Sequence, residues 1–180
     1  SATINGVAHN FAGVNPASTV SVGKAGAERT ITNVAAGRIS ATSTDAINGS
    51  QLYAVTSEVD KGVAYAGDVK AAAAAANKFT RKLGEQTNIV GGVADTSKLT
   101  DGNIGVVSNG TDTLNIKLAK DVKVDSVTTG NTVINNNGLT VGGKTYVTNN
   151  GINANNQKVT NVADGQVAAV SKDAANGGQC

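Results

Sequence analysis

Residues 32–52 read TNVAAGRISATSTDAINGSQL, and the chain returns to nearly the same sequence at residues 160–180, TNVADGQVAAVSKDAANGGQC. The two copies lie 128 residues apart and share twelve identical residues over their first twenty positions. The sequence between the copies is unrelated to them. The repeated segment is therefore interpreted as a connector used twice, not as a unit of a stacked solenoid.

The residues of the connector predict an extended piece, a turn and the start of a helix. Residues 32–34 favour an extended backbone, and Gly37 permits turn geometry that other residues avoid. The hydroxyl-rich residues 40–44 are typical of a helix cap, and Asp45 is expected in the first helical turn, where its charge suits the helix dipole. The helix is expected to end near residue 60, and its apolar residues are Ile47, Leu52, Val55 and Val59.

The apolar residues of this predicted helix form a narrow stripe. Leu52, Val55 and Val59 follow the spacing i, i+3 and i+7, which suits the seam of a coiled coil. An isolated helix of this length is marginal in water, so the connector is expected to pack against copies of itself. A dimer and a trimer would both bury such a seam, and the pattern alone leaves both open.

The run ERTITNVAAGRISATSTDAINGSQLYAV, residues 28–55, resembles the neck of the trimeric autotransporter adhesins, the YadA-like surface proteins of Gram-negative bacteria. In that family the neck joins a β-rich head to a three-stranded coiled coil. The alternative is a Gly/Asn/Thr-rich repeat in a β-solenoid. The resemblance implies a parallel homotrimer, and it implies a role in the trimeric neck for these residues: Asn33, Val34, Gly37, Asp45, Ile47, Asn48, Gln51, Leu52, Asn161, Val162, Gly165, Asp173, Asn176 and Gln179.

The resemblance covers nearly the whole chain and divides it into four segments. Residues 1–28 are expected to be the end of a YadA-like head, a parallel β-roll, because Val7 and Val20 are spaced like successive short strands. The other expected segments are a neck with a short coiled-coil helix at residues 29–62, an interleaved β head domain at residues 63–157 and a second neck at residues 158–180. The expected fold class is mostly β with short coiled-coil helices.

Short strands are predicted through the expected head domain. Residues 104–107 and 113–118 flank Ser-Asn-Gly, which indicates a hairpin. The run GINANNQKVTNV resembles the GIN domain of these adhesins, and LTDGNIGVV and LNIKLAKDVKVDSVTTGN resemble their Trp-ring domain, although the chain has no Trp. Further short strands are expected at residues 88–90, 132–134, 139–141 and 145–148. Apolar and polar residues also alternate at Val122 and Val124.

Residues 71–76 are six consecutive alanines, for which two conformations stay open. Alanine is the best helix former, so propensity favours a helix. The flanking runs YAGD and RKLGE resemble the opening strands of the globular domains that follow necks, which favours an ordered loop instead.

The composition argues against an ordinary monomeric domain. The chain has no Trp or Met, only 3% aromatic residues, 22 Gly and 21 Asn, so a monomer would struggle to bury a core. Oligomerisation would supply that burial, and the 39% hydrophobic content opposes disorder. A net charge of +2 from scattered residues indicates no nucleic-acid partner.

No apolar run approaches the length of a membrane span, and no signal-peptide pattern opens the sequence. The resemblance implies a location at the bacterial cell surface. It also places the export signal and the outer-membrane anchor outside these residues.

The sequence offers no constellation for catalysis, a cofactor or a metal. His9 is the only histidine, and the aspartates at 101, 112, 121 and 125 lie in or beside predicted turns. No P-loop, dinucleotide fingerprint or EF-hand pattern occurs. Cys180 stands where the first copy has Leu52; it is either an introduced attachment point or a natural small apolar residue. A non-enzymatic protein is expected, and a polysaccharide-cleaving β-helix is disfavoured.

Two functions remain as hypotheses. The first is a piece of a surface adhesin that attaches to host matrix, cells or abiotic surfaces, promotes autoagglutination and serves virulence through many weak sites. The second is a structural spacer of the same fibre that binds nothing itself.

Overall fold

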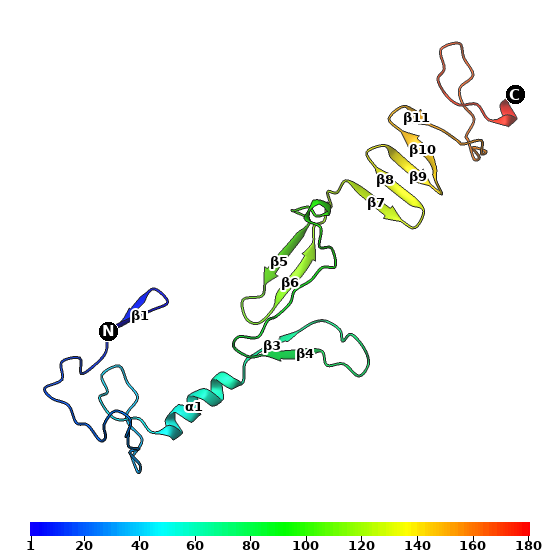
Figure 1. Ribbon diagram of the computed structural model, residues 1–180. Coiled ribbons are helices and arrows are strands. Elements are labelled where there is room, and N and C mark those ends of the chain that lie inside the picture. Colours follow the sequence, from blue (N-terminus) through cyan, green and yellow to red (C-terminus); the bar gives the residue numbers. More distant parts are fainter. The chain divides into compact units, whose positions relative to one another are not determined.

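The computed structural model describes residues 1–180 (Figure 1). The chain forms two units, Ser1–Val90 and Gly91–Cys180. Eleven short strands, one α-helix and two 3-10 turns are joined by long loops. The expectation of a mostly β chain with a short helix is confirmed at this level.

The first unit opens with a hairpin of β1 (Ala2–Ile4) and β2 (Val7–His9), which pair antiparallel. Asn5 and Gly6 between them have φ angles of 51° and 76°, the geometry of a two-residue Asn-Gly hairpin turn. The predicted strand at Val7 is present as β2, but it pairs antiparallel with β1, and the predicted strand at Val20 is absent. The Asn-Gly turn reverses the chain directly after β1, and Val20 lies outside any strand.

The helix α1 spans Gly49–Asp60 and is capped by Asn48. Asn48 and Gln51 form a capping box, in which each side chain binds the backbone N–H of the other residue. The capping box binds the first free amides of the helix, so the helix begins at Gly49. Asp45 and Ile47 therefore lie before the helix, and the prediction that placed Asp45 in its first turn and Ile47 within it is wrong. The predicted end at Asp60 is confirmed, and Gly62 follows with a φ of 71°.

After α1 the chain forms a second hairpin, in which β3 (Val63–Ala66) pairs antiparallel with β4 (Lys78–Arg81). Residues 71–76 lie in the loop that joins the two strands, where Ala75 N–H donates to Ala72 O at 2.9 Å. The alanine run is therefore an ordered loop. Alanine side chains offer no apolar stripe that would anchor a helix here, and the strand pairing holds both ends of the loop.

The second unit begins with a 3-10 turn, η1 (Thr96–Lys98), and a hairpin of β5 (Ile104–Ser108) and β6 (Leu114–Leu118). This confirms the predicted hairpin around Ser-Asn-Gly. Within its turn the Asn109 Oδ1 accepts from three backbone N–H groups, those of residues 111, 112 and 113. The strand expected at residues 88–90 is absent, and the predicted alternation at Val122 and Val124 lies outside any strand.

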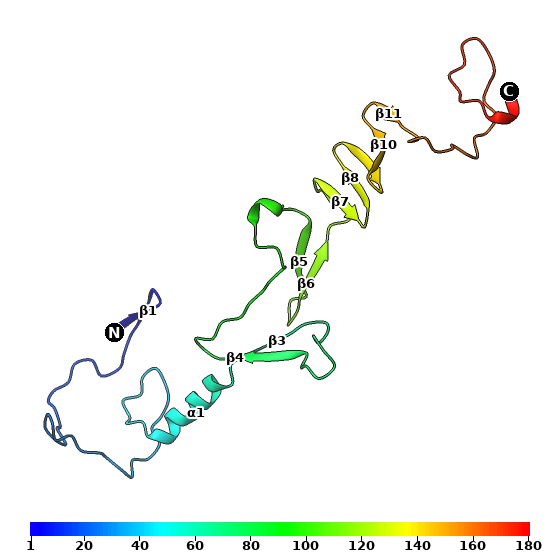
Figure 2. The same ribbon diagram turned by 45° about the vertical axis from the view of Figure 1, so that its right-hand side comes forward.

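A five-stranded antiparallel meander follows, in the order β11-β10-β9-β8-β7 (Figure 2). Three of these strands confirm the predictions for residues 132–134, 139–141 and 145–148. The first and last strands were not predicted. The bounds are β7 Ser126–Thr129, β8 Thr132–Asn135, β9 Gly138–Val141, β10 Lys144–Thr148 and β11 Gly151–Ile152.

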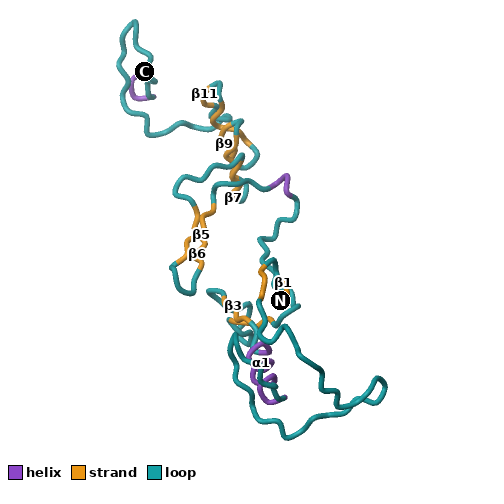
Figure 3. Tube along the Cα trace, turned by 90° about the vertical axis from the view of Figure 1, so that its left-hand side faces the viewer, coloured by secondary structure: helices purple, strands orange, loops and turns teal.

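The single chain encloses no core, and loops account for much of its trace (Figure 3). No residue is buried, and the accessible surface is 16261 Å². A compact protein of this mass exposes about 8,000 Å². The apolar surface of this chain is therefore available to partners.

Candidate functional site

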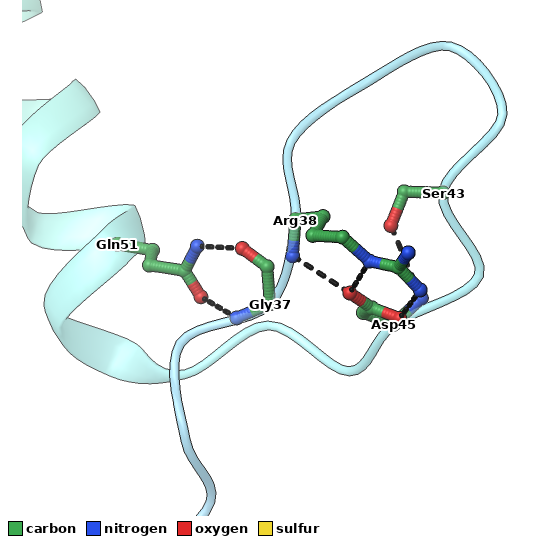
Figure 4. Close-up of polar contacts among 5 residues, drawn as sticks. All are labelled: Gly37, Arg38, Ser43, Asp45 and Gln51. Atoms are coloured by element: carbon green, nitrogen blue, oxygen red, sulfur yellow. Dashed lines mark hydrogen bonds and ion pairs between the residues drawn. The ribbon is translucent and has the colours of Figure 1, made fainter.

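The repeated connector folds into a polar loop in both of its copies. We call residues 34–51 the first neck loop and residues 162–179 the second neck loop. In the first neck loop the Gln51 side chain clamps the backbone of Gly37: Gly37 N–H donates to Gln51 Oε1 at 2.8 Å, and Gln51 Nε2 donates to Gly37 O at 2.7 Å (Figure 4). The amide in the first turn of α1 thus joins two residues that are fourteen positions apart in the sequence.

Asn48 adds a second tie across the same loop. Its Nδ2 donates to Val34 O at 3.0 Å, and its backbone N–H donates to Gln51 Oε1 at 3.2 Å. Its Oδ1 accepts from Gln51 N–H at 3.3 Å as the helix cap. One asparagine therefore starts the helix and holds the incoming chain against it.

Gly37 is required for its small size and not for an unusual backbone angle. A Cβ at this position would collide with the Ala46 carbonyl oxygen and lie 2.9 Å from the Asp45 Cβ. The two arms of the loop approach so closely that only glycine fits between them.

An ion pair closes the outer part of the first neck loop. Arg38 Nε and Nη2 donate to the two carboxylate oxygens of Asp45 at 2.8 and 3.0 Å, and Arg38 N–H donates to Asp45 Oδ2 at 2.8 Å (Figure 4). The hydrogen bonds from the guanidinium and the backbone of Arg38 lower the pKa of Asp45 below its usual value, and the carboxylate raises the pKa of Arg38. The Arg38 side chain is 83% exposed, so the pair contributes little to stability.

The second neck loop repeats the clamp almost bond for bond. Gly165 N–H donates to Gln179 Oε1 at 2.8 Å, and Gln179 Nε2 donates to Gly165 O at 2.7 Å. Asn176 Nδ2 donates to Val162 O at 2.9 Å and caps the 3-10 turn η2 (Gly177–Gln179) with the same capping box. A Cβ on Gly165 would collide with the Ala174 carbonyl oxygen, as at Gly37.

The chain enters both loops through an asparagine in the left-handed region. Asn33 and Asn161 each have a φ of 60°, a conformation that asparagine tolerates better than most residues. The prediction of a simple extended piece at residues 32–34 is therefore wrong at its centre.

The outer ion pair is the main difference between the two loops. Gln166 stands where the first loop has Arg38, and only its backbone N–H reaches Asp173, at 2.9 Å from Oδ2. Asn176 Nδ2 instead gains a contact of 2.7 Å to Asp164 Oδ1.

The structure brings together most of the residues predicted for the neck. Gly37, Asn48 and Gln51 join one hydrogen-bonded network with the Val34 carbonyl, and their repeats do the same. Asp45 bonds separately to Arg38 and Ser43, and Asp173 to Gln166 and Ser171. Ile47 and Leu52 do not join it, since their side chains are apolar, and these residues are 49% and 63% exposed.

Sequence reasoning missed two participants, Arg38 and Ser43. Ser43 Oγ accepts from Asp45 N–H at 3.2 Å, and Ser171 makes the same bond to Asp173. The identity of this serine in both copies was the available signal. Arg38 carried no such signal, because the second copy has Gln there.

The network is suited to holding a backbone shape. Its groups are amides, one ion pair and backbone carbonyls, and nowhere does the chain gather three or more His, Cys, Asp or Glu side chains that could hold a metal ion. No helix combines the length and the apolar character needed to cross a membrane.

Comparison with known proteins places these loops in context. The sequence profile of the coiled stalk of trimeric autotransporter adhesin matches residues 30–75 and 158–179, which contain the two neck loops. Autotransporter adhesin BtaE of Brucella suis biovar 1 is 41% identical over 180 residues, 98% of this chain. Trimeric autotransporter adhesin AtaA of an Acinetobacter species is 34% identical over 144 residues, 72% of this chain.

The chain spans 22% of the length of BtaE and 4% of the length of AtaA. Among solved structures, the C-terminal YadA-like domain of a Burkholderia pseudomallei protein is 64% identical over 33% of this chain and 28% of its own, with a TM-score of 0.32. The C-terminal stalk of Acinetobacter AtaA, fused to adaptors, is 38% identical over 47% of this chain and 30% of its own, with a TM-score of 0.27. TM-scores this low add nothing on the fold. The family profile at both neck loops and the two curated relatives together show that the chain belongs to the trimeric autotransporter adhesin family.

Proposed function

We propose that this chain is a segment of a parallel homotrimeric fibre that attaches bacteria to host matrix proteins, cells or abiotic surfaces and to one another. The observation that carries the proposal is the absence of any buried residue in a chain with well-formed local structure. Local hydrogen bonds shape each hairpin and neck loop, while burial of the apolar surface requires partners.

The apolar stripe of α1 supports assembly of the chain with itself. Leu52, Val55 and Val59 are 63%, 60% and 55% exposed in the single chain. Full burial of such a side chain is worth about 1.5–3 kcal/mol. Three parallel copies would bury all their stripes at once, and the same assembly would cover the open edges of the two-stranded sheets.

Within this fibre the neck loops act as the connectors between β-rich segments and helical stalk. The proposed segments are residues 1–28, 29–62, 63–157 and 158–180. In both loops the predicted neck residues shape the junction between these segments. The fibre stands at the bacterial cell surface and is anchored in the outer membrane by a part of the protein outside this chain.

Attachment would arise from multivalency. Each weak polar contact of the Asn- and Thr-rich surface is repeated three times around one axis and again on many fibres. The alternative is that these residues form a spacer that carries a distal binding head, in agreement with the match to a stalk profile.

The test has two parts. Sedimentation of the purified chain at micromolar concentration is expected to show a trimer; a folded monomer would refute the assembly. Binding of that trimer to immobilised collagen, fibronectin, whole cells and polystyrene then separates the two roles. Saturable binding to any of them supports attachment, and a stable trimer that binds none of them supports the spacer.

A further inference from the structure

The hairpin that follows α1 presents two unlike faces. Residues directly opposite each other in an antiparallel pair share a face, so the pairs Val63–Arg81 and Tyr65–Phe79 lie on one side. The Tyr65 and Phe79 rings stack with centroids 5.5 Å apart, which confirms that they share it. The opposite face carries only Ala64, Ala66, Lys78 and Thr80. We call the side with the two rings the aromatic face.

The aromatic face has the composition of a protein interface. It holds two of the five aromatic residues of the chain, and Val63, Tyr65 and Phe79 remain 60%, 43% and 49% exposed. Tyr, Phe and Arg are enriched at the centres of interfaces.

Arg81, on the same face, has a hydrogen-bond donor that no group of this chain satisfies. Its Nε is shielded from solvent and has no hydrogen-bond partner, and the guanidinium makes no ion pair. The two carboxylates of the last turn of α1 are already engaged: Glu58 with Lys61 at 2.7 Å, and Asp60 with Lys82 at 2.9 Å. A shielded donor without an acceptor is costly, which favours an acceptor from outside this chain.

The position of Arg81 indicates which group supplies that acceptor. Arg81 pairs with Val63, and its carbonyl packs against Gly62, so it lies just beyond the end of α1. In a parallel threefold assembly, equivalent atoms of all copies lie at the same height along the axis. At the height of Arg81, the next copy then presents the C-terminal end of its α1. The Glu58 and Val59 carbonyls at that end accept from the Lys61 and Gly62 N–H groups, which leaves the Ser57 and Asp60 carbonyls as acceptors. The end also carries partial negative charge, and the last turn of α1 contains no basic residue.

We propose that the aromatic face is buried against a second copy of this chain, with the Arg81 guanidinium donating to the carbonyls that remain free at the C-terminal end of the neighbouring α1. The contact rests on the trimer proposed above and adds to it. It links the helical seam to the β segment through a charge-assisted bond, repeated once for each pair of neighbours.

The first test compares Arg81→Gln with Lys78→Gln, which removes the same charge from the opposite face of the same strand. Loss of one charge-assisted bond per copy should raise the concentration at which the trimer dissociates at least about tenfold. The Lys78→Gln control should stay within about twofold, since an exposed charge contributes little. Equal effects of the two variants would overturn the proposal.

The second test does not depend on the stability of the variants. In a Cys180→Ser background, one tagged copy carries Arg81→Cys and an untagged copy carries Asp60→Cys, and the two are co-expressed and mildly oxidised. Each copy then has a single thiol, so any disulfide joins two copies. A mixed dimer on a non-reducing gel supports the contact. Dimers of the Arg81→Cys copy alone, or no dimer from an intact trimer, would overturn it while leaving the trimer in place; a monomeric starting protein would instead refute the proposed assembly.

Discussion

Replacing Gln51 by alanine tests whether the amide clamp holds the neck. The substitution removes both hydrogen bonds to Gly37 and the bond from Asn48 N–H, three in all. It also leaves the backbone N–H and C=O of Gly37 without partners in a half-buried place. At about 0.5–1.5 kcal/mol for each net bond, and more where a group is stranded, the expected loss is about 2–4 kcal/mol per copy.

The loss should be visible as a lower melting temperature. The melting temperature of a chain of this length falls by about 2–4 °C for each kcal/mol of lost stability. In an oligomer the lost free energy and the unfolding entropy both scale with the number of copies, so the shift per kcal/mol and copy is the same. The expected shift is therefore roughly 5–15 °C. Circular dichroism at fixed protein concentration measures it. Gln157→Ala serves as the matched control, because Gln157 is exposed and its side chain forms no hydrogen bond. If the Gln51 and Gln157 variants melt together, the clamp does not stabilise the neck and our reading of the repeat is wrong.

Two further predictions concern the same loop, and a third concerns the apolar stripe of α1. Gly37→Ala should lower the melting temperature because its Cβ meets a carbonyl oxygen, whereas Gly91→Ala, with open space around its Cβ, should not; a thermal scan of both variants compares them. Arg38→Gln should raise the pKa of Asp45 toward its usual value, as measured by NMR titration of the carboxyl group. Because folding lowers this pKa, its contribution to stability is present above the ordinary carboxyl pKa and is lost as the pH falls through the lowered one, so the variant should lose less stability in acid. Leu52→Asp should place like charges at the seam and cause dissociation together with loss of β signal; a variant that sediments as a folded monomer would show that the trimer is not obligate.

The sequence by itself determined the repeat, five of the seven short strands of the second unit and the family. The repeat was visible because hydrogen-bonding roles at a fixed spacing demand the same side chains twice: Asn48 and Gln51 recur as Asn176 and Gln179. The hairpin around Asn109 was predictable because its turn residues act locally.

Only the tertiary structure decided which partner each polar group takes. Asp45 has the chemistry of a helix N-terminus, but Asn48 and Gln51 satisfy those amides first, and Asp45 turns to Arg38 instead. The alanine run favours a helix by propensity, but strand pairing on both sides makes it a loop. Helix and turn propensities act over a few residues, whereas the clamp from Gln51 to Gly37 joins groups fourteen positions apart, and such pairings become visible only once the chain is folded.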